Sequence, residues 1–520
     1  MPHNVQAERH RLPIQIQNRI IHFCLALTPS IPPPLTADEP VTPEWDRLAG
    51  MCGRRARTRR IRERSEVQRL GLKLMRVCKA WKPLAAKYLY TEPLLTPYNL
   101  LSFASSLGAG EAKWSDLNLH PHSTPGRYVR TLDLSHILDG SDAPHPLYVT
   151  RACRSILSLI PNLTHLILPP LHTHILEYLI NVDNCNFPKL RAIEGIDTHL
   201  VQCKSTLRRL SPPLELLNLY GLVYDPHISS LKNSSIEETI LSFPKLHTLV
   251  WHGSSSRDGI SSMICHSEMP NLSRLSIAPC QDTRDELEFI NNFLVSKGTR
   301  LISLTILEPR EWPPRRTQFP YGILEFLPNL RHLSVLCTGD LNRLLENAKE
   351  HKLEILTIPK PNAYIPSPSP SPSPAPAPTL GPLNPYGGGM VGQGLLAQNV
   401  VSEEDWSGHT GFSHQIDKLR NILTRAEIKP IAVVLDGYRW LPHDMGLAAL
   451  EAGVSGRMRR LACRLKSYNV ELRDMNGKQA PCLGEHQRGR SGARGLSPVS
   501  PVRSPDRKGV GDGDGDEDGG

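Results

Sequence analysis

The eight residues "PNLTHLIL", Pro161 to Leu168, contain a pattern that recurs along the chain. Apolar residues occupy its third, sixth and eighth positions, the alternation typical of a short strand with one buried face. Gly195 is the one exception, at the eighth position of its stretch. A single match would mean little, but nine in register indicate a repeat. The other eight stretches begin at Arg127, Pro188, Pro212, Pro244, Pro270, Thr299, Pro328 and His351.

The spacing of these stretches predicts a leucine-rich-repeat solenoid. Successive starts lie 23 to 34 residues apart, which places one strand in each unit. We expect an α/β fold in which the strands form a curved parallel sheet. Segments such as "CRSILSLI" (153–160) and "RDELEFINNFLV" (284–295) should form the return helices. An ordinary α/β domain with leucine-rich strands remains the alternative, although a proline begins most of the units.

Composition sets the boundaries of the repeat region. The units run from residue 100 to residue 358, and a Pro/Ser/Gly-rich stretch at 359–412 is not expected to fold. Helix-like "IDKLRNILTRA" and the strand-like segments at Pro430 and Tyr468 predict the last repeats and a cap within 413–475. The charged, Gly-rich residues 477–520 should be a disordered tail.

Two apolar-faced stretches precede the repeats. The first is "RLPIQIQNRIIHFCLAL", Arg11 to Leu27, with proline in the first helical turn. The second, "LMRVCKAWKPLAAKYLY" (Leu74 to Tyr90), reads as a single amphipathic helix, bent at Pro83. An inserted loop of about 40 residues, from 28 to 66, separates them and ends in "RRARTRRIRER", which contains seven arginines. These arginines suit a solvated, partly helical segment, a nuclear import signal or a nucleic-acid contact. Nucleic acid is the least favoured of the three, because no aromatic residues interleave with the arginines.

Composition and motifs exclude several classes of function. The 11 cysteines include no C-x-x-C pair and no zinc-site spacing, so we expect reduced thiols and neither a metal nor a cofactor. No apolar run is long enough for a membrane span, and no signal peptide is apparent. We therefore expect a cytoplasmic or nuclear protein. The sequence has no P-loop, G-x-S-x-G or H-E-x-x-H motif, and we predict no catalytic residues.

The two N-terminal stretches resemble the F-box, a helical module that here would span residues 11–95. The family pattern begins with Leu-Pro, continues with isoleucines at helical spacing, and later has an apolar "L-x-x-V-C-x-x-W-x-x-L-A". Two features depart from it: Gln15 stands where an acidic residue is usual, and the insertion splits the module. The matching residues are Leu12, Pro13, Ile16, Ile20, Leu74, Val77, Cys78, Trp81, Leu84 and Ala85.

This resemblance implies a function without catalysis. F-box proteins dock on the small adaptor of a cullin-RING ubiquitin ligase, and their repeats hold a target protein for ubiquitination. The implied adaptor-binding residues are Leu12, Pro13, Ile16, Ile20, Val77 and Trp81, although packing within the module would explain each of them equally well. A non-catalytic interaction scaffold with a degenerate F-box is the alternative.

Target binding should use residues between the repeat leucines. We expect these residues to face solvent on the concave side of the solenoid, and to contact a protein that the sequence does not identify. The candidates are Thr164, His165, Glu215, His247, Thr248, Ser273, Arg274, Arg331 and His332.

Overall fold

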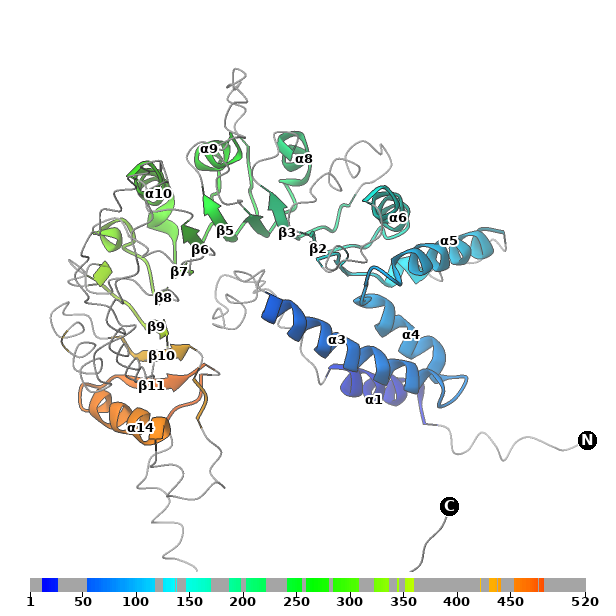
Figure 1. Ribbon diagram of the computed structural model, residues 1–520, viewed down its shortest axis with the longest axis horizontal. Helices are drawn as coiled ribbons and strands as arrows, with labels where there is room; N and C mark the ends of the chain where they lie inside the picture. The colour runs from blue at the N-terminus through cyan, green and yellow to red at the C-terminus, as the bar shows by residue number, and fades with distance from the viewer. Residues whose placement is uncertain are drawn as a thin grey trace, which may run out of the picture. The chain divides into compact units, whose positions relative to one another are not determined.

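The computed structural model describes the helical N-terminal part and most of the repeat units (Figure 1). The inserted residues 28–53, the stretch 360–412 and the tail beyond 480 lie outside the described residues. The described ranges are 12–26, 54–116, 125–135, 137, 146–169, 187–197, 203–220, 241–254, 259–279, 284–307, 322–335, 344–345, 351–359, 421, 430–436, 438–440, 453–475 and 477–480.

Eleven described strands form one parallel sheet, in which each strand pairs with the next in chain order. The α/β class is thereby confirmed, and each of the nine sequence units contributes one of the first nine strands. Parallel strands need a crossover between them, which the return segments provide. The strands are β1 (Thr131–Asp133), β2 (His165–Ile167), β3 (Ala192–Asp197), β4 (Leu216–Tyr220), β5 (Thr248–Ser254), β6 (Arg274–Pro279), β7 (Ser303–Ile306), β8 (His332–Val335), β9 (Ile355–Pro359), β10 (Ala432–Asp436) and β11 (Glu471–Asp474).

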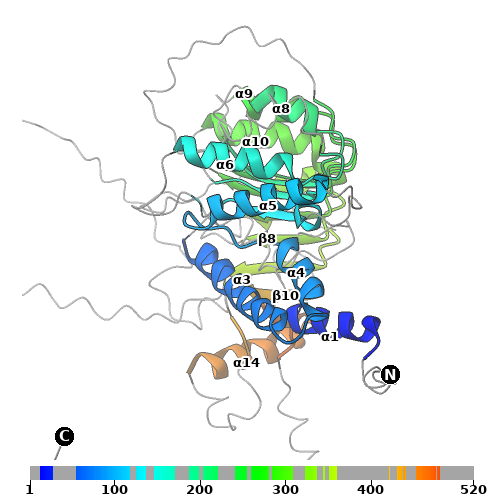
Figure 2. The ribbon, with the colours of Figure 1, turned by 90° about the vertical axis from the view of Figure 1, so that its right-hand side faces the viewer.

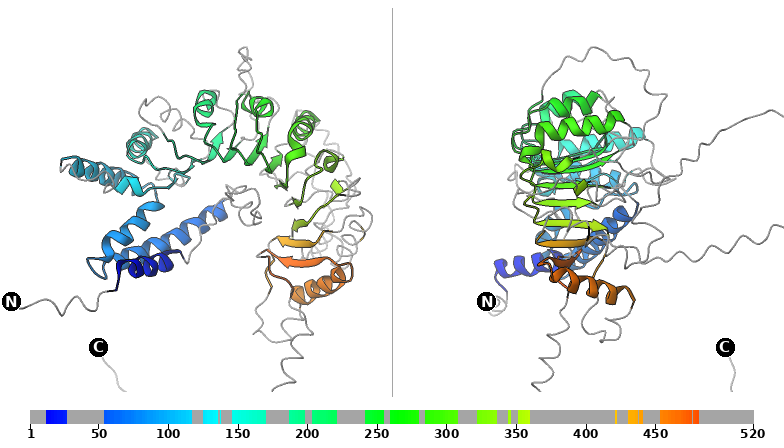
Figure 3. Two further views of the ribbon diagram at one scale, coloured as in Figure 1. Left: turned by 180° about the vertical axis from the view of Figure 1, so that it is seen from behind. Right: turned by 90° about the vertical axis from the view of Figure 1, so that its left-hand side faces the viewer.

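Helices cover one face of this sheet, as Figures 2 and 3 show. The segments predicted to be return helices are helical, at residues 153–158 and 284–295. The α-helices of the repeat region are α5 (Leu100–Asp116), α6 (Pro146–Ser158), α8 (Cys203–Leu210), α9 (Gly259–His266), α10 (Arg284–Lys297) and α14 (Gly453–Lys466), and the 3-10 turns are η1 (Pro125–Tyr128), η3 (Gly298–Arg300) and η4 (Ile323–Phe326).

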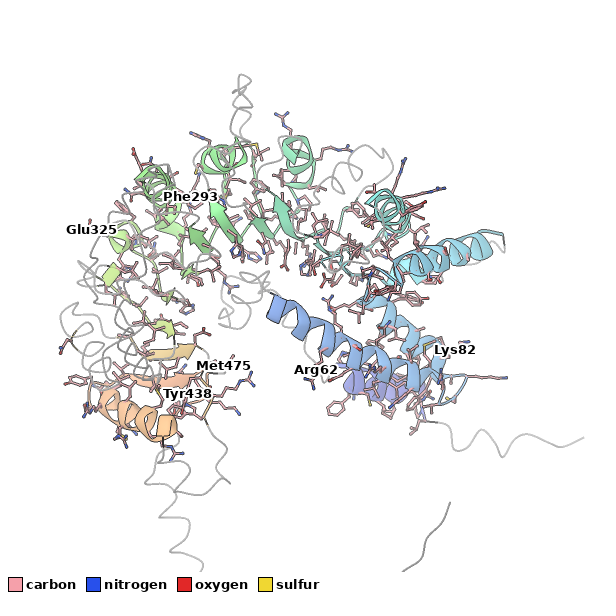
Figure 4. The ribbon with its side chains drawn as sticks, in the orientation of Figure 1. Arg62, Lys82, Phe293, Glu325, Tyr438 and Met475 are labelled. Atoms are coloured by element: carbon pink, nitrogen blue, oxygen red, sulfur yellow. The ribbon has the colours of Figure 1, made fainter. Side chains whose placement is uncertain are left out.

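The second residue of each strand builds the core between sheet and helices. These residues pair in register along the whole sheet, and all of them are buried. Each buried side chain of this size contributes about 1.5–3 kcal/mol. Trp251 adds an edge-to-face contact with Phe293 of α10, with ring centroids 5.5 Å apart (Figure 4). The row consists of Leu132, Leu166, Ile193, Leu217, Leu249, Leu275, Leu304, Leu333, Leu356, Val433 and Leu472.

The second residue of the repeated sequence pattern links neighbouring units. In four units its side-chain nitrogen donates to the carbonyl of the first residue of the preceding unit. Backbone carbonyls at the turns between units are thereby satisfied. The bonds are Asn162 to Arg127 (2.9 Å), Asn271 to Pro244 (2.5 Å), Arg300 to Pro270 (3.0 Å) and Asn329 to Thr299 (2.6 Å).

Gly195, the exception to the sequence pattern, forms a β-bulge. The register of β3 against β4 shifts between Glu194 and Ile196, so that Ile196 takes the place of the missing apolar residue. Gly195 has a φ of +87°, and a Cβ there would lie 2.5 Å from the carbonyl oxygen of Leu168. The position therefore requires glycine.

The N-terminal part contains three described helices: α1 (Ile14–Ala26), α3 (Arg54–Met75) and α4 (Trp81–Thr91). The prediction of one helix from Leu74 to Tyr90 was wrong, because α3 ends at Met75 and a turn precedes α4. Pro83 lies in the first turn of α4, where an amide donor has no intrahelical acceptor, and so it marks a helix start rather than a bend. The inserted loop was expected to extend to Glu66, but helix α3 begins at Arg54.

The end of the described chain folds back on β11. Gln479 pairs antiparallel with Arg473, and the amide of Lys478 donates to the Asp474 carboxylate at 2.9 Å. The Tyr438 backbone carbonyl accepts the Met475 amide at 2.9 Å beside the same strand (Figure 4). Residues 477–480, predicted to begin a disordered tail, therefore cover the last edge of the sheet.

Candidate functional site

Helix α1 has one apolar face that packs on the other N-terminal helices. Ile21 and Leu25 are buried against Leu74 of α3 and Ala85 of α4. Glycine at position 71 permits close packing of α3 and α4, because a Cβ there would collide with Leu89. Partly buried residues complete this small core: Cys24, Val67, Met75, Trp81, Leu84 and Tyr88.

The opposite face of α1 is also apolar, and it is exposed. Ile16 and Phe23 are 40% and 67% exposed, at a spacing that places them on one side of the helix, and Leu12, just before the helix, is 50% exposed. The Pro13 carbonyl accepts the amides of Ile16 and Gln17 at 2.9 and 3.1 Å, which fixes the start of the helix. Exposed large apolar side chains on one side of a helix are typical of a protein-binding surface.

The predicted adaptor-binding residues divide into two groups. Ile16 is exposed on α1, Leu12 and Pro13 are exposed just before it, and Val77 is exposed in the turn before α4. Ile20 is half-buried, and Trp81 packs on the core of the three helices.

Sequence reasoning missed Phe23 as a surface candidate. The sequence places Phe23 on the same side of the helix as Ile16 and Ile20, which precede it by seven and three residues. The same spacing also suits a core residue, so it does not show whether the side chain is exposed.

The face of the sheet opposite the helices carries mainly polar residues. We call it the polar face, defined by the first and third residues of every strand. Ser276, Thr305, Ser334 and Thr357 lie in register on four neighbouring strands and form a row of hydroxyl groups. All four side chains are 8% exposed or less, so this row lies within the sheet and is not an accessible surface.

Several target-binding candidates are less accessible than predicted. Thr248, Ser273 and Arg274 are 1%, 5% and 3% exposed, so the expectation that they face solvent was wrong. Neighbouring parallel strands lie close together and bury side chains that the alternation of the sequence predicts to be exposed. The Ser273 hydroxyl donates to the His247 carbonyl at 3.3 Å, and Thr164 donates to the Arg130 carbonyl at 3.0 Å.

The accessible candidates lie where the strands begin. We call this the strand-start edge, formed by the residue immediately before each strand. Arg331 is exposed and makes a 3.7 Å ion pair with Glu354, and Arg191 and Glu215 form a similar pair at 3.5 Å. Exposed pairs contribute little to stability, so these charges remain available to a partner. Thr164, His247 and Glu215 on this edge are half-buried.

The histidines of the repeats have different environments. His165 Nε2 lies 2.7 Å from the Glu194 carboxylate, and His247 Nδ1 lies 2.9 Å from the Thr248 hydroxyl. Burial lowers the pKa of His332; Arg274 and Arg331 lower it further, while Glu354 opposes the shift. The surroundings of His332 therefore favour its neutral form.

Helix α3 contacts the polar face at the first strand. Arg64 Nη1 donates to Asp133 Oδ2 at 2.7 Å, and these side chains are only 13% and 2% exposed. The Ser135 amide and hydroxyl donate to the other carboxylate oxygen at 3.0 and 2.6 Å. The chain also continues from α4 into the sheet, since the Arg130 amide donates to the Thr91 carbonyl at 2.9 Å.

Two buried thiols and the grouping of potential metal ligands describe the chemistry of the reactive side chains. Burial raises the pKa of the Cys153 and Cys265 thiols to about 12, which makes them poor nucleophiles. Within the described ranges, no three His, Cys, Asp or Glu side chains are grouped to hold a metal ion. None of the described helices has the length and apolar character needed to cross a membrane.

Comparison with known proteins gives no assignment: no family model matches the chain, and no curated protein is significantly similar to it in sequence.

Proposed function

We propose that the chain is the substrate receptor of an SCF-type cullin-RING ubiquitin ligase, built from a split F-box and leucine-rich repeats. The observation that supports this most strongly is the second apolar face of α1. Leu12 and Ile16 belong to the F-box-like pattern, and they are exposed although the first face of the same helix is packed. An exposed apolar stripe on a packed helix is suited to an adaptor protein.

In this proposal the N-terminal helices bind the adaptor and the repeats bind the target. The strand-start edge offers exposed or half-buried polar residues from many units, which suits recognition of an extended protein surface. Ubiquitin transfer is carried out by other subunits, and the receptor acts by bringing the target close to them.

Co-purification with the ligase adaptor tests the proposal. The full chain would be co-expressed with the adaptor as wild type and as Leu12→Asp/Phe23→Asp. Each substitution places a charge in an apolar contact worth about 1.5–3 kcal/mol, so the complex should be lost. Both residues are exposed, so the variant should fold normally. Val295→Asp is the matched control, because Val295 is an exposed apolar residue on α10.

Retention of the complex by both variants would contradict α1 as the docking site. Failure of the wild type to bind any adaptor would instead favour the second function, a leucine-rich interaction scaffold. Gln15 supports that alternative, since it is exposed on α1 where the F-box pattern has an acidic residue.

A further inference from the structure

The exposed side of the second half of helix α3 combines positive charge with apolar side chains. Arg69, Lys73 and Arg76 follow one another at steps of four and three residues, which places them on one side of the helix, and all three are exposed. Arg76 immediately follows α3, and its amide donates to the Lys73 carbonyl at 3.0 Å, which continues the helical turn. Leu70 and Leu72 lie beside these cations and are 37% and 49% exposed. We call these five residues the basic-apolar surface.

Further cations follow in the turn that joins α3 to α4 and on α4 itself. Lys79 is exposed in the turn, and Lys82 and Lys87 are exposed on α4 (Figure 4). Residues 67–91 contain six basic residues and no acidic one. Cations three or four positions apart on a helix repel one another. A ligand that brings several negative charges would therefore relieve an unfavourable arrangement in this region.

The aromatic side chains of this region pack within the chain. Trp81 and Tyr88 lie against the core of the three helices, and Tyr90 packs on Phe103 with ring centroids 6.1 Å apart. Trp81, Tyr88 and Tyr90 are all half-buried. Stacking on nucleic-acid bases needs an open ring face, so the region does not suit a single-stranded nucleic acid.

We infer that the basic-apolar surface binds an anionic lipid surface. Anionic lipids attract clustered Lys and Arg side chains, and because lipids diffuse, each cation gains a headgroup without a matched arrangement of carboxylates. Leu70 and Leu72 enter the boundary between headgroups and acyl chains, as the apolar side chains of interfacial helices do. A nucleic-acid duplex would pair with the cations but leave both leucines in water. The inference goes beyond the proposed function, since adaptor binding through α1 requires no membrane.

Co-sedimentation of the full chain with lipid vesicles tests this assignment. Phosphatidylcholine vesicles with about 30% phosphatidylserine should bind the wild type, whereas phosphatidylcholine alone should not. Each cation near such a surface contributes about fivefold to affinity, so Arg69→Gln/Lys73→Gln/Arg76→Gln should bind roughly 100-fold more weakly. Added salt should weaken wild-type binding. The three side chains are exposed and glutamine favours helix, so circular dichroism should show a folded variant.

Two further variants separate the site from the overall charge of the chain. Arg151, Arg154 and Arg208 are exposed on the outer helices α6 and α8, and their triple replacement by glutamine should change vesicle binding by less than about twofold. Leu70→Gln/Leu72→Gln keeps every charge and should weaken binding about tenfold, because it removes the apolar contact with the lipid.

Three results would overturn the inference. Equal loss in the two triple variants would show that binding follows net charge alone. Unchanged binding of the leucine variant would show that the leucines do not touch the lipid. Complete release of the wild type from the vesicles by a short peptide of alternating Asp and Ser, at equal charge, would favour an acidic protein as the ligand. The assay contains no adaptor, so none of these results bears on the proposed function.

Discussion

The N-terminal helices and the repeat sheet bury their apolar residues to different extents. In the sheet, the second residue of every strand is buried, and from β2 to β10 it has a strand of the same chain on either side. Among the helices, four residues form the buried core, while Phe23 on α1 and Leu12 just before it remain exposed. Neighbouring repeat units bury one another's apolar side chains, whereas three helices alone have little core of their own. The described sheet thus buries its apolar row within the chain, whereas the described helices leave apolar side chains exposed, as the proposed adaptor contact requires.

The largest expected effect lies in the sheet. Trp251→Ala removes a fully buried ring that contacts Phe293, and should cost about 3–5 kcal/mol of unfolding free energy. Phe23→Ala removes a ring of similar type from an exposed site and should change stability by about 0.5 kcal/mol or less. Urea denaturation followed by circular dichroism measures both. Similar costs would show that α1 packs its second face within the chain.

The two ion pairs of α3 sharpen the same comparison between buried and exposed groups. Asp133→Ala leaves Arg64 buried without its carboxylate and should cost about 3 kcal/mol. Glu66→Ala removes the exposed partner of Arg62 and should cost about 0.5 kcal/mol or less. The measurement is again urea denaturation, at low and high salt. If Asp133→Ala lowers the unfolding free energy no more than Glu66→Ala does, the contact between α3 and β1 does not stabilise the fold.

A smaller effect is expected from His332. Its pKa in the folded state is lowered from 6.5, so the unfolded chain binds more protons at mildly acidic pH. The stability linked to this group is present above about pH 6.5 and is lost as the pH falls through the folded pKa. The urea midpoint of the wild type should therefore fall more between about pH 7.5 and pH 5.5 than that of His332→Gln. Identical pH dependence would contradict the shift.

Much of the sheet could be predicted from the sequence. The pattern of third, sixth and eighth apolar residues locates the first nine strands, because strand alternation imposes that spacing on a one-sided core. Even the exception at Gly195 corresponds to a structural feature, the β-bulge. The return helices at 153–158 and 284–295 also follow from periodicity alone.

Other features depend on tertiary contacts that a linear pattern does not contain. No glycine or capping side chain marks the turn between α3 and α4, and Ala80 at the start of α4 makes no capping bond. Thr248 and Arg274 look solvent-facing by alternation, yet both are buried in the sheet. Phe23 and Ile21 both look like core residues by spacing, and only the packing of α1 on α3 and α4 separates them.

Hydrogen exchange of α1 tests the central claim most directly. The amides of residues 14–26 would be followed in the free chain and in the presence of the ligase adaptor, with α10 as an internal reference. We predict that the adaptor slows exchange in α1 and around Val77 and leaves α10 unchanged, because the exposed face of α1 becomes buried. Unchanged exchange in α1 in an adaptor complex, or protection confined to the sheet, would contradict the account.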